Sequence, residues 1–345
     1  MNPVALRLLN QQLYAPQFTT PEEVVSHLGA MQAQEYRLMR WAVSLRTKKP
    51  SIESFRLAYD SGKIVRLHLM RGTWQLISGD DYWWMLDLLA EKSCRVIKGW
   101  MASNHITIPD DECVRIKEIL ARCAEDCGSA TKEDFVNALA AQGIIMDDHR
   151  LSYHIRMSEL SGTLCSGELL PMKATYSLTE SRIPRKEQLD REEALARLAR
   201  KYFISRSPAT LEDYAWWSGL NISDCRKSIA LLTDELHPVK WHNRVFFLHQ
   251  AARHHGMRQG TLLLLPPYDE YLIGYKSRDI VLPESHQHRA HNSSGIFYPI
   301  VLRDGIACGN WKPFEKEVHC QPFDPEDNLE GVEKAWAKYQ HYLQH

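Results

Sequence analysis

The sequence predicts an α+β protein, mainly helical, in which three tandem winged-helix modules precede a compact C-terminal β-barrel-like domain and a terminal helix. The first observation is a phrase, Thr-x-Glu-(Asp/Glu)-hydrophobic, that begins at Thr20, Thr131 and Thr210. The second is that β-prone segments follow the second and third copies. Three copies in series indicate one structural module that is used three times.

Each copy has the composition of a helix start. The threonine hydroxyl can accept a hydrogen bond from a free backbone N–H group of the first turn, and the acidic residues favour the positive end of the helix dipole. The second and third copies also share a preceding alanine and a following aromatic residue, Phe135 or Tyr214. One capped helix is common in any helical protein, so the prediction depends on the repetition.

The third copy predicts the elements of a winged helix in order. A periodic helix over 191–204 precedes the capped helix 211–218, which stops at Gly219, and a third helix is expected over 224–236. Two β-prone runs around a polar turn then occupy 239–248. In winged-helix DNA readers the third helix enters the major groove. Such modules also mediate protein contacts, so the fold alone does not establish DNA binding.

The other two copies predict the same order of elements with different spacing. A further helix and a long strand enlarge the first module. The expected elements are helices 132–141 and 148–161 with strands 162–167 and 174–178 in the second copy, and helices 2–13, from Thr20, about 35–46 and 51–60 with strand 64–77 in the first.

After Gly256 the pattern becomes that of β structure. Strand-like residues 261–275 surround Pro266-Pro267, and Asp304-Gly305 is a strong hairpin signal. The predicted domains are residues 1–127, 128–185, 186–250 and 251–325, with a terminal helix in 326–345.

Composition limits the possible functions. The chain of 345 residues has 44% hydrophobic and 25% charged residues, as an ordinary globular protein does. It contains no apolar run of about 20 residues and no signal-peptide pattern at its start, so a cytoplasmic protein is expected. The net charge of −1 excludes DNA binding by overall charge and requires a local basic face. A monomer without a cofactor is expected.

No metal site is predicted. The eight cysteines lack a C-x-x-C pair and are expected to be reduced, mostly buried thiols. His286, His288 and His291 form H-x-H-x-x-H, but no cysteine or carboxylate lies at ligand spacing nearby. A mobile basic loop is the favoured interpretation.

Two glutamines are the strongest candidates for chemistry. When the first and third copies are aligned from their capping threonines, Gln32 falls at Ile222 and Gln34 at Asp224, at the turn into the expected third helix. Because the backbone is irregular at a helix start, both amides can face one cavity, and the helix dipole can help orient a water. The same spacing also fits ordinary polar capping residues. The residues alone leave both interpretations open.

The chain resembles the AlkZ/YcaQ-like winged-helix DNA glycosylases along nearly its whole length. The resemblance is densest at residues 28–34, 71–74, 209–220 and 265–275. The family's Gln-hydrophobic-Gln signature matches Gln32-Ala33-Gln34. The resemblance implies hydrolysis of the N-glycosidic bond of bases alkylated at a ring nitrogen, including crosslinked guanines in some members. A non-catalytic winged-helix DNA-binding protein or transcriptional regulator is the alternative, and a scaffold for protein contacts is a third.

The implied chemistry needs no strong acid. An N7-alkylated guanine is already positively charged, so two neutral amides can suffice if they position a water and stabilise the transition state. No lysine nucleophile is required, which implies a monofunctional enzyme without strand cleavage. Glu35 is either a base or a solvated carboxylate, and the latter is favoured.

Further residues are expected to support the site or to bind double-stranded DNA. Arg71, Thr73 and Gln75 alternate along the expected strand and would share one face, although the family commonly has His at the position of Gln75. A plain polar face of a hairpin is the alternative. Asp269 and Glu270 are expected to accept hydrogen bonds from Arg278 or backbone amides. The candidate DNA contacts are Arg37, Arg226, Lys227, Lys240, Arg244, Arg253, His254, His255 and Arg258.

Overall fold

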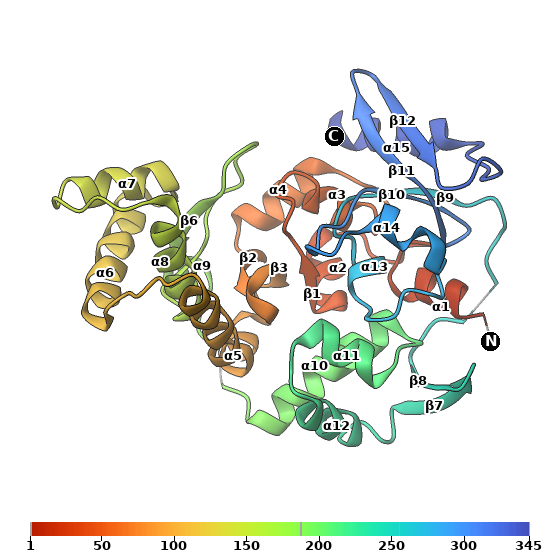
Figure 1. Ribbon diagram of the computed structural model, residues 1–345, viewed down its shortest axis with the longest axis horizontal. Helices are drawn as coiled ribbons and strands as arrows, with labels where there is room; N and C mark the ends of the chain where they lie inside the picture. The colour runs from red at the N-terminus through yellow and green to blue at the C-terminus, as the bar shows by residue number, and fades with distance from the viewer. Residues whose placement is uncertain (1, 187, 255, 345) are drawn as a thin grey trace. The chain divides into compact units, whose positions relative to one another are not determined.

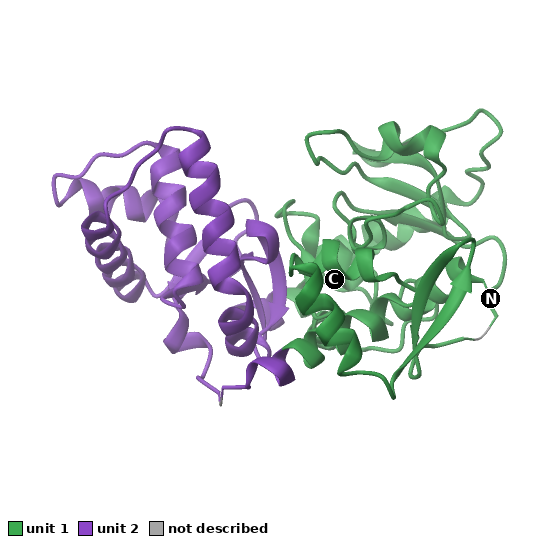
Figure 2. Cartoon of the chain, turned by 60° about the horizontal axis from the view of Figure 1, so that its bottom comes forward, with its two compact units in different colours: residues 1–55, 195–345 green, residues 56–194 purple. Residues whose placement is uncertain are grey.

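The computed structural model describes residues 2–186, 188–254 and 256–344. The protein is α+β with antiparallel sheets, as predicted. It divides into two compact units (Figure 2): unit 1 comprises residues 1–55 and 195–345, and unit 2 comprises residues 56–194. The five predicted domains stay predictions.

The three repeated phrases are helix starts, which confirms the expectation for each. In every copy the threonine side chain accepts from the backbone N–H three residues later, and the acidic residue there accepts from the threonine N–H. The bonds from the Thr20 backbone lower the pKa of Glu23, and those from Thr131 lower the pKa of Asp134. The helices are α2 (Pro21–Leu28), α7 (Lys132–Ala140) and α11 (Leu211–Ser218).

The third copy has the expected order of elements, at the lower side of Figure 1. Gly219, with φ 68°, ends α11, and the following helix is shorter than expected because the chain enters a strand at Leu236. The elements around α11 are α10 (Arg191–Arg206), α12 (Ile222–Ala230), β7 (Leu236–Trp241) and β8 (Arg244–His249).

The second copy lies wholly in unit 2. Its three strands form a sheet of order β4-β6-β5, and Phe135, Leu151 and Leu164 join its core. Its elements besides α7 are α6 (Asp110–Cys127), β4 (Ala130–Thr131), α8 (Asp148–Leu160), β5 (Leu164–Ser166), β6 (Thr175–Leu178) and the short α9 (Thr179–Arg182).

The first copy departs from the expected pattern at two places. The third helix begins at Met39 rather than at about Glu35, because the chain after Gly29 runs as a short strand and then bends. The expected strand 64–77 is a hairpin whose turn contains Arg71, with φ 60°. The elements are α1 (Pro3–Asn10), β1 (Ala30–Gln32), α3 (Met39–Ser44), α4 (Ile52–Asp60), β2 (Ile64–Leu69), η1 (Met70–Gly72), β3 (Thr73–Ser78) and α5 (Tyr82–Ser103).

The C-terminal region contains an open sheet of order β12-β11-β10-β9, and the strands among the described residues form no closed barrel. The barrel-like expectation is therefore corrected to an open antiparallel sheet. Asp304 and Gly305 form the predicted hairpin turn with φ 51° and 85°. After Pro266-Pro267 the expected strand gives way to a short helix that Asp269 caps. The elements are β9 (Leu262–Leu265), α13 (Glu270–Ile273), η2 (Glu284–His286), α14 (Gln287–Ala290), β10 (Ile300–Arg303), β11 (Ile306–Phe314), β12 (Glu317–Pro322) and α15 (Val332–Gln344).

The core of unit 1 joins its two sequence segments. Trp41 from α3 packs in one cluster with Tyr271 from α13 and Trp311 from β11, and its indole Nε1 donates to the Leu264 carbonyl oxygen at 2.9 Å. The first 55 residues are thus part of the same unit as the C-terminal region. None of the helices that the structure describes is both long enough and apolar enough to cross a bilayer.

Candidate active site

Gln32 and Gln34 lie at the end of β1 and in the bend that follows it. The side chain of Gln32 is buried, with the residue 6% exposed, whereas Gln34 is exposed. Within the described part of the chain, no hydrogen bond engages the side chain of Gln34. The end of a strand, rather than an irregular helix start, therefore sets the relation between the two amides.

A buried ion pair holds the backbone of this strand. The Gln32 N–H group donates to Glu270 Oε1 at 2.7 Å, and Glu270 Oε2 accepts from Arg206 Nη2 at 2.6 Å. Arg206 also donates to the Leu28 carbonyl oxygen at 2.7 Å and to the Ala30 carbonyl oxygen at 2.9 Å. The segment that carries Gln32 is thus bonded to α10 and α13 through side chains.

A second buried pair lies beside the first. Asp269 accepts from Arg46 Nη1 at 2.9 Å and from Arg46 Nη2 at 2.7 Å, and it caps α13 through the Tyr271 N–H group. Asp269 and Glu270 therefore accept hydrogen bonds as expected, but their donors include Arg46 and Arg206 rather than Arg278. Arg278 Nε instead donates to the Leu272 carbonyl oxygen.

Glu35 and Tyr268 also lie near the glutamine segment. Glu35 accepts from the Arg37 N–H group at 3.1 Å and lies 3.7 Å from Arg37 Nε. Burial raises the pKa of Tyr268, and the charge of Glu35 raises it further. Tyr268 is held at φ 58°, a conformation that a bulky residue seldom adopts. Sequence reasoning missed Tyr268 and Arg206 as parts of the site, and the only signal for Tyr268 was its place after two prolines.

Of the expected supporting residues, Arg71, Thr73 and Gln75 lie in unit 2 and Glu35 lies in unit 1. Arg71 is in the turn η1, so it does not alternate with Thr73 and Gln75 along a strand as expected. Thr73 and Gln75 both lie on β3, and Gln75 Nε2 donates to Thr73 Oγ1 at 2.9 Å. Gln75 is buried. The shared polar face therefore holds for two of the three residues.

Some of the candidate DNA-binding residues bond to other parts of the protein, and others are exposed. Arg244 pairs with Asp279 at 2.7 Å, and Arg253 donates to the carbonyl oxygens of Leu9 and Ala15. These two guanidinium groups hold the protein's own structure. His255 lies outside the described residues. The exposed candidates are Arg37, Arg226, Lys227, Lys240, His254 and Arg258.

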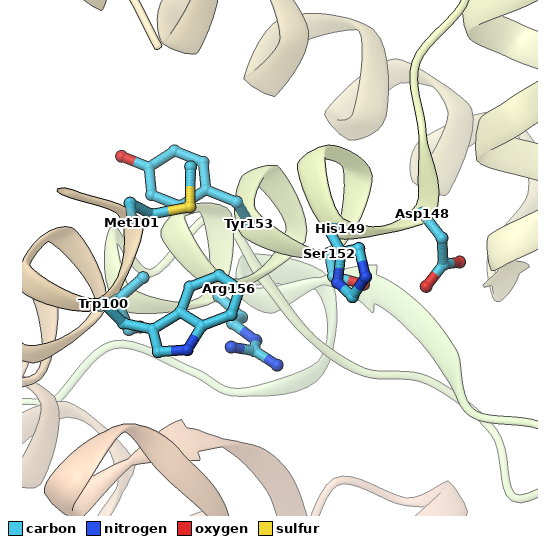
Figure 3. Close-up of a pocket in the computed structure, with 8 residues that line it drawn as sticks. Trp100, Met101, Asp148, His149, Ser152, Tyr153 and Arg156 are labelled. Carbon is cyan, nitrogen blue, oxygen red and sulfur yellow. The ribbon is translucent and has the colours of Figure 1, made fainter. Parts of the chain in front are cut away.

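The third helices of the second and third copies present different surfaces. On α12 both Arg226 and Lys227 are exposed. On α8 the residues His149, Ser152 and Arg156 line a cavity of about 170 Å³ whose other wall is α5 (Figure 3). Because α5 covers this face of α8, we expect α12 to be the more accessible helix.

A larger groove lies on unit 1, away from the glutamines. It has a volume of about 730 Å³ and is lined by the start of α11, the β7–β8 hairpin and residues 276–278. Neither Gln32 nor Gln34 lines this groove or the smaller cavity.

The histidine motif forms no metal site among the described residues. Residues 284–290 are helical rather than a loop. His286 Nε2 lies 3.2 Å from Asp324 Oδ2, and the ring of His291 lies 5.0 Å from that of Phe297. The two outer histidines thus have separate partners.

Comparisons with known proteins agree with this architecture. The model of the family "DNA glycosylase AlkZ-like" matches residues 25–342. An interstrand DNA cross-link repair glycosylase of Streptomyces sahachiroi is 26% identical over 353 aligned residues, which cover 96% of this chain and 93% of the relative. The solved structure of Streptomyces sahachiroi DNA glycosylase AlkZ superposes with a TM-score of 0.78 at 24% identity, covering 99% of this chain and 95% of that one.

Proposed function

This chain belongs to the DNA glycosylase AlkZ-like family, and on that premise we propose that it is a monofunctional DNA glycosylase that releases N7-alkylated purines from duplex DNA. The observation that carries the proposal is the pairing of a buried, backbone-anchored Gln32 with an exposed Gln34. The Gln32 side chain is buried on a strand whose backbone is bonded to Glu270, and the Gln34 side chain is open to solvent.

The chemistry assigned to the glutamines is water positioning. An amide carbonyl oxygen accepts from water and an amide NH₂ group donates, so two amides can hold one water and orient its lone pair toward C1′ of the sugar. The leaving purine is cationic before the bond breaks, so it departs as a neutral base without a general acid. Preorganised dipoles then stabilise the positive charge that develops on the sugar.

DNA binding is assigned to winged-helix modules. The elements α10, α11, α12, β7 and β8 follow each other as in a winged helix, which supports placing α12 in the major groove. Arg226 and Lys227 on α12 and Lys240 on the wing would then contact phosphates or base edges. The substrate named for the Streptomyces relative extends the proposal to crosslinked purines.

The test is base release from a duplex that contains one N7-methylguanine. We expect release by the wild type and loss of release in Gln34→Ala, with duplex binding retained. Gln142→Ala removes another exposed amide, in unit 2, and serves as the matched control. The product should be an intact abasic strand that breaks only on heating in alkali.

Other outcomes separate the alternatives. If no alkylated duplex loses its base although binding is intact, the protein is a non-catalytic DNA-binding protein. If duplex binding does not weaken with added salt, both the enzyme and the regulator are contradicted. A duplex with an N7-linked interstrand crosslink, assayed alongside, shows whether crosslinked purines are also substrates.

A further inference from the structure

We propose that Glu270, together with Arg206, is a positioning residue that takes the place of a neighbouring strand along one edge of β1 and so fixes the segment that presents Gln32 and Gln34. This inference rests on the proposed function, because it concerns the same two glutamines. Neither Glu270 nor Arg206 is assigned a contact with the substrate.

The pattern of bonds is that of a strand edge. Along an extended chain, the hydrogen-bonding groups of alternate residues point to the same edge and normally pair with a neighbouring strand. Here Ala30 and Gln32 of β1 are bonded by side chains instead, and the carbonyl oxygen of Leu28, the last residue of α2, is bonded in the same way. The two carbonyl oxygens accept from the Arg206 guanidinium, and the Gln32 N–H group donates to the Glu270 carboxylate.

The two side chains also fix each other. Arg206 donates to Glu270 Oε2 from Nη2 at 2.6 Å and from Nε at 3.2 Å. Both side chains are buried, at 0% and 2% exposure, and the guanidinium lies 4.5 Å from the ring centre of Trp217. The pair therefore has little freedom to move relative to β1.

The attraction between the two charges does not by itself explain why they are buried at this place. An apolar pair of similar volume is often as stable as a buried ion pair, because both charges lose their hydration. An apolar pair could not, however, bond the Ala30 and Gln32 backbone groups of β1 or the Leu28 carbonyl oxygen. We therefore infer that the two charged side chains serve to fix the backbone of the segment that carries Gln32 and Gln34.

The neighbouring pair offers a matched control. The side chain of Asp269 is 2% exposed, as that of Glu270 is, and it is paired as closely with a buried arginine. Arg46 donates to Ala42 and Gln11 as well as to Asp269. Replacing Asp269 with Asn therefore perturbs a buried ion pair without removing a bond to β1.

The experiment compares Glu270→Gln with Asp269→Asn. Glutamine cannot accept on both sides, so its NH₂ group must face either the guanidinium or the Gln32 N–H group. We expect the single-turnover rate of N7-methylguanine release to fall by about 10- to 100-fold in Glu270→Gln, since small displacements of a catalytic group cost that much. Duplex Kd should be unchanged, and Asp269→Asn should keep the wild-type rate at temperatures where both variants are folded.

Equal rate losses in the two variants would show a merely structural role and overturn the inference, as would an unchanged rate in Glu270→Gln. If Glu270→Gln does not fold, the double variant Arg206→Met with Glu270→Met replaces both charges at once. Because this variant also loses three bonds to buried backbone groups, it is assayed at a temperature where its circular dichroism matches that of the wild type. It is expected to show the same slow release with normal binding there, and a wild-type rate in it contradicts the inference.

The activity of Gln34→Ala tests the proposed function separately from the positioning inference. If Gln34→Ala releases base as fast as the wild type, the role of the glutamines fails and the positioning inference falls with it. If Gln34→Ala is inactive while Glu270→Gln is fully active, only the positioning inference fails.

Discussion

At the residue scale, the glutamines could be singled out from the sequence, but the groups that hold them could not. The Gln-Ala-Gln string matches a family signature. Arg206, by contrast, stands at the end of a helix, where a basic residue is ordinary because it favours the helix dipole. Glu270 lies 238 residues from Gln32, and no local pattern signals a bond over that separation.

At this scale we predict that His27, at the end of α2, makes the stability of the fold depend on pH. Burial lowers the pKa of His27 to about 4, although the hydrogen bond with Asn10 opposes the shift. Its Nε2 lies 2.7 Å from the Asn10 carbonyl oxygen, so the folded protein holds the ring neutral with a proton on that nitrogen.

The sign of the effect on stability follows from linkage. In the unfolded chain the pKa returns to about 6.5, so protonation favours unfolding. The stabilisation by neutral His27 is complete above about pH 6.5 and is lost as the pH falls toward about 4. Urea unfolding at about pH 7 and about pH 4.5 should show a smaller loss of stability in His27→Gln than in the wild type. Identical losses in the two proteins would contradict the assignment.

At the element scale, the sequence correctly predicted those elements whose start depends on residues that are close neighbours in the chain. The three capped helices begin at the predicted residues because the cap and its partners lie within four positions of each other. The hairpin turn at Asp304-Gly305 was predicted for the same reason.

The predictions were wrong where contacts between residues that are far apart in the sequence determine the local structure. The chain is extended at Ala30–Gln32, where its backbone is bonded to side chains of α10 and α13, and residues 270–273 are helical because Asp269 caps them.

The element-scale prediction concerns α12. Its exposed Arg226 and Lys227 should contact DNA, whereas α5 covers the corresponding face of α8. The double variant Arg226→Ala with Lys227→Ala should weaken duplex binding and reduce the slope of log affinity against log salt by about 2, since each phosphate contact contributes about 0.9. Fluorescence anisotropy at several salt concentrations measures both quantities.

The matched control for α12 removes two exposed arginines from α6, in Arg115→Ala with Arg122→Ala. This variant has the same change in net charge and should retain the wild-type slope. If the α6 variant loses as much affinity as the α12 variant, binding follows overall charge, and α12 has no special role.

At the scale of the whole molecule, the linear series of domains stays a prediction, and unit 1 contains residues from both ends of the chain. The packing of the two end segments in one core cannot be predicted from hydrophobic periodicity. The residues that make the contact, such as Trp41 and Tyr271, look like ordinary apolar positions of their own segments. The net charge of −1, by contrast, follows directly from the sequence. It affects how DNA binding and the reaction rate should depend on salt.

Because the chain as a whole is nearly neutral, its attraction to DNA must come from a few exposed basic groups, while the proposed chemical step uses two neutral amides. Binding and chemistry should therefore respond differently to salt. Duplex affinity should fall steeply from about 50 to about 200 mM salt, with a slope of about −4 to −5 if some five phosphates are contacted. The single-turnover rate with the DNA fully bound should stay constant over the same range. A rate that falls with salt at saturation would place a charged group such as Glu35 in the chemical step instead of the glutamines alone.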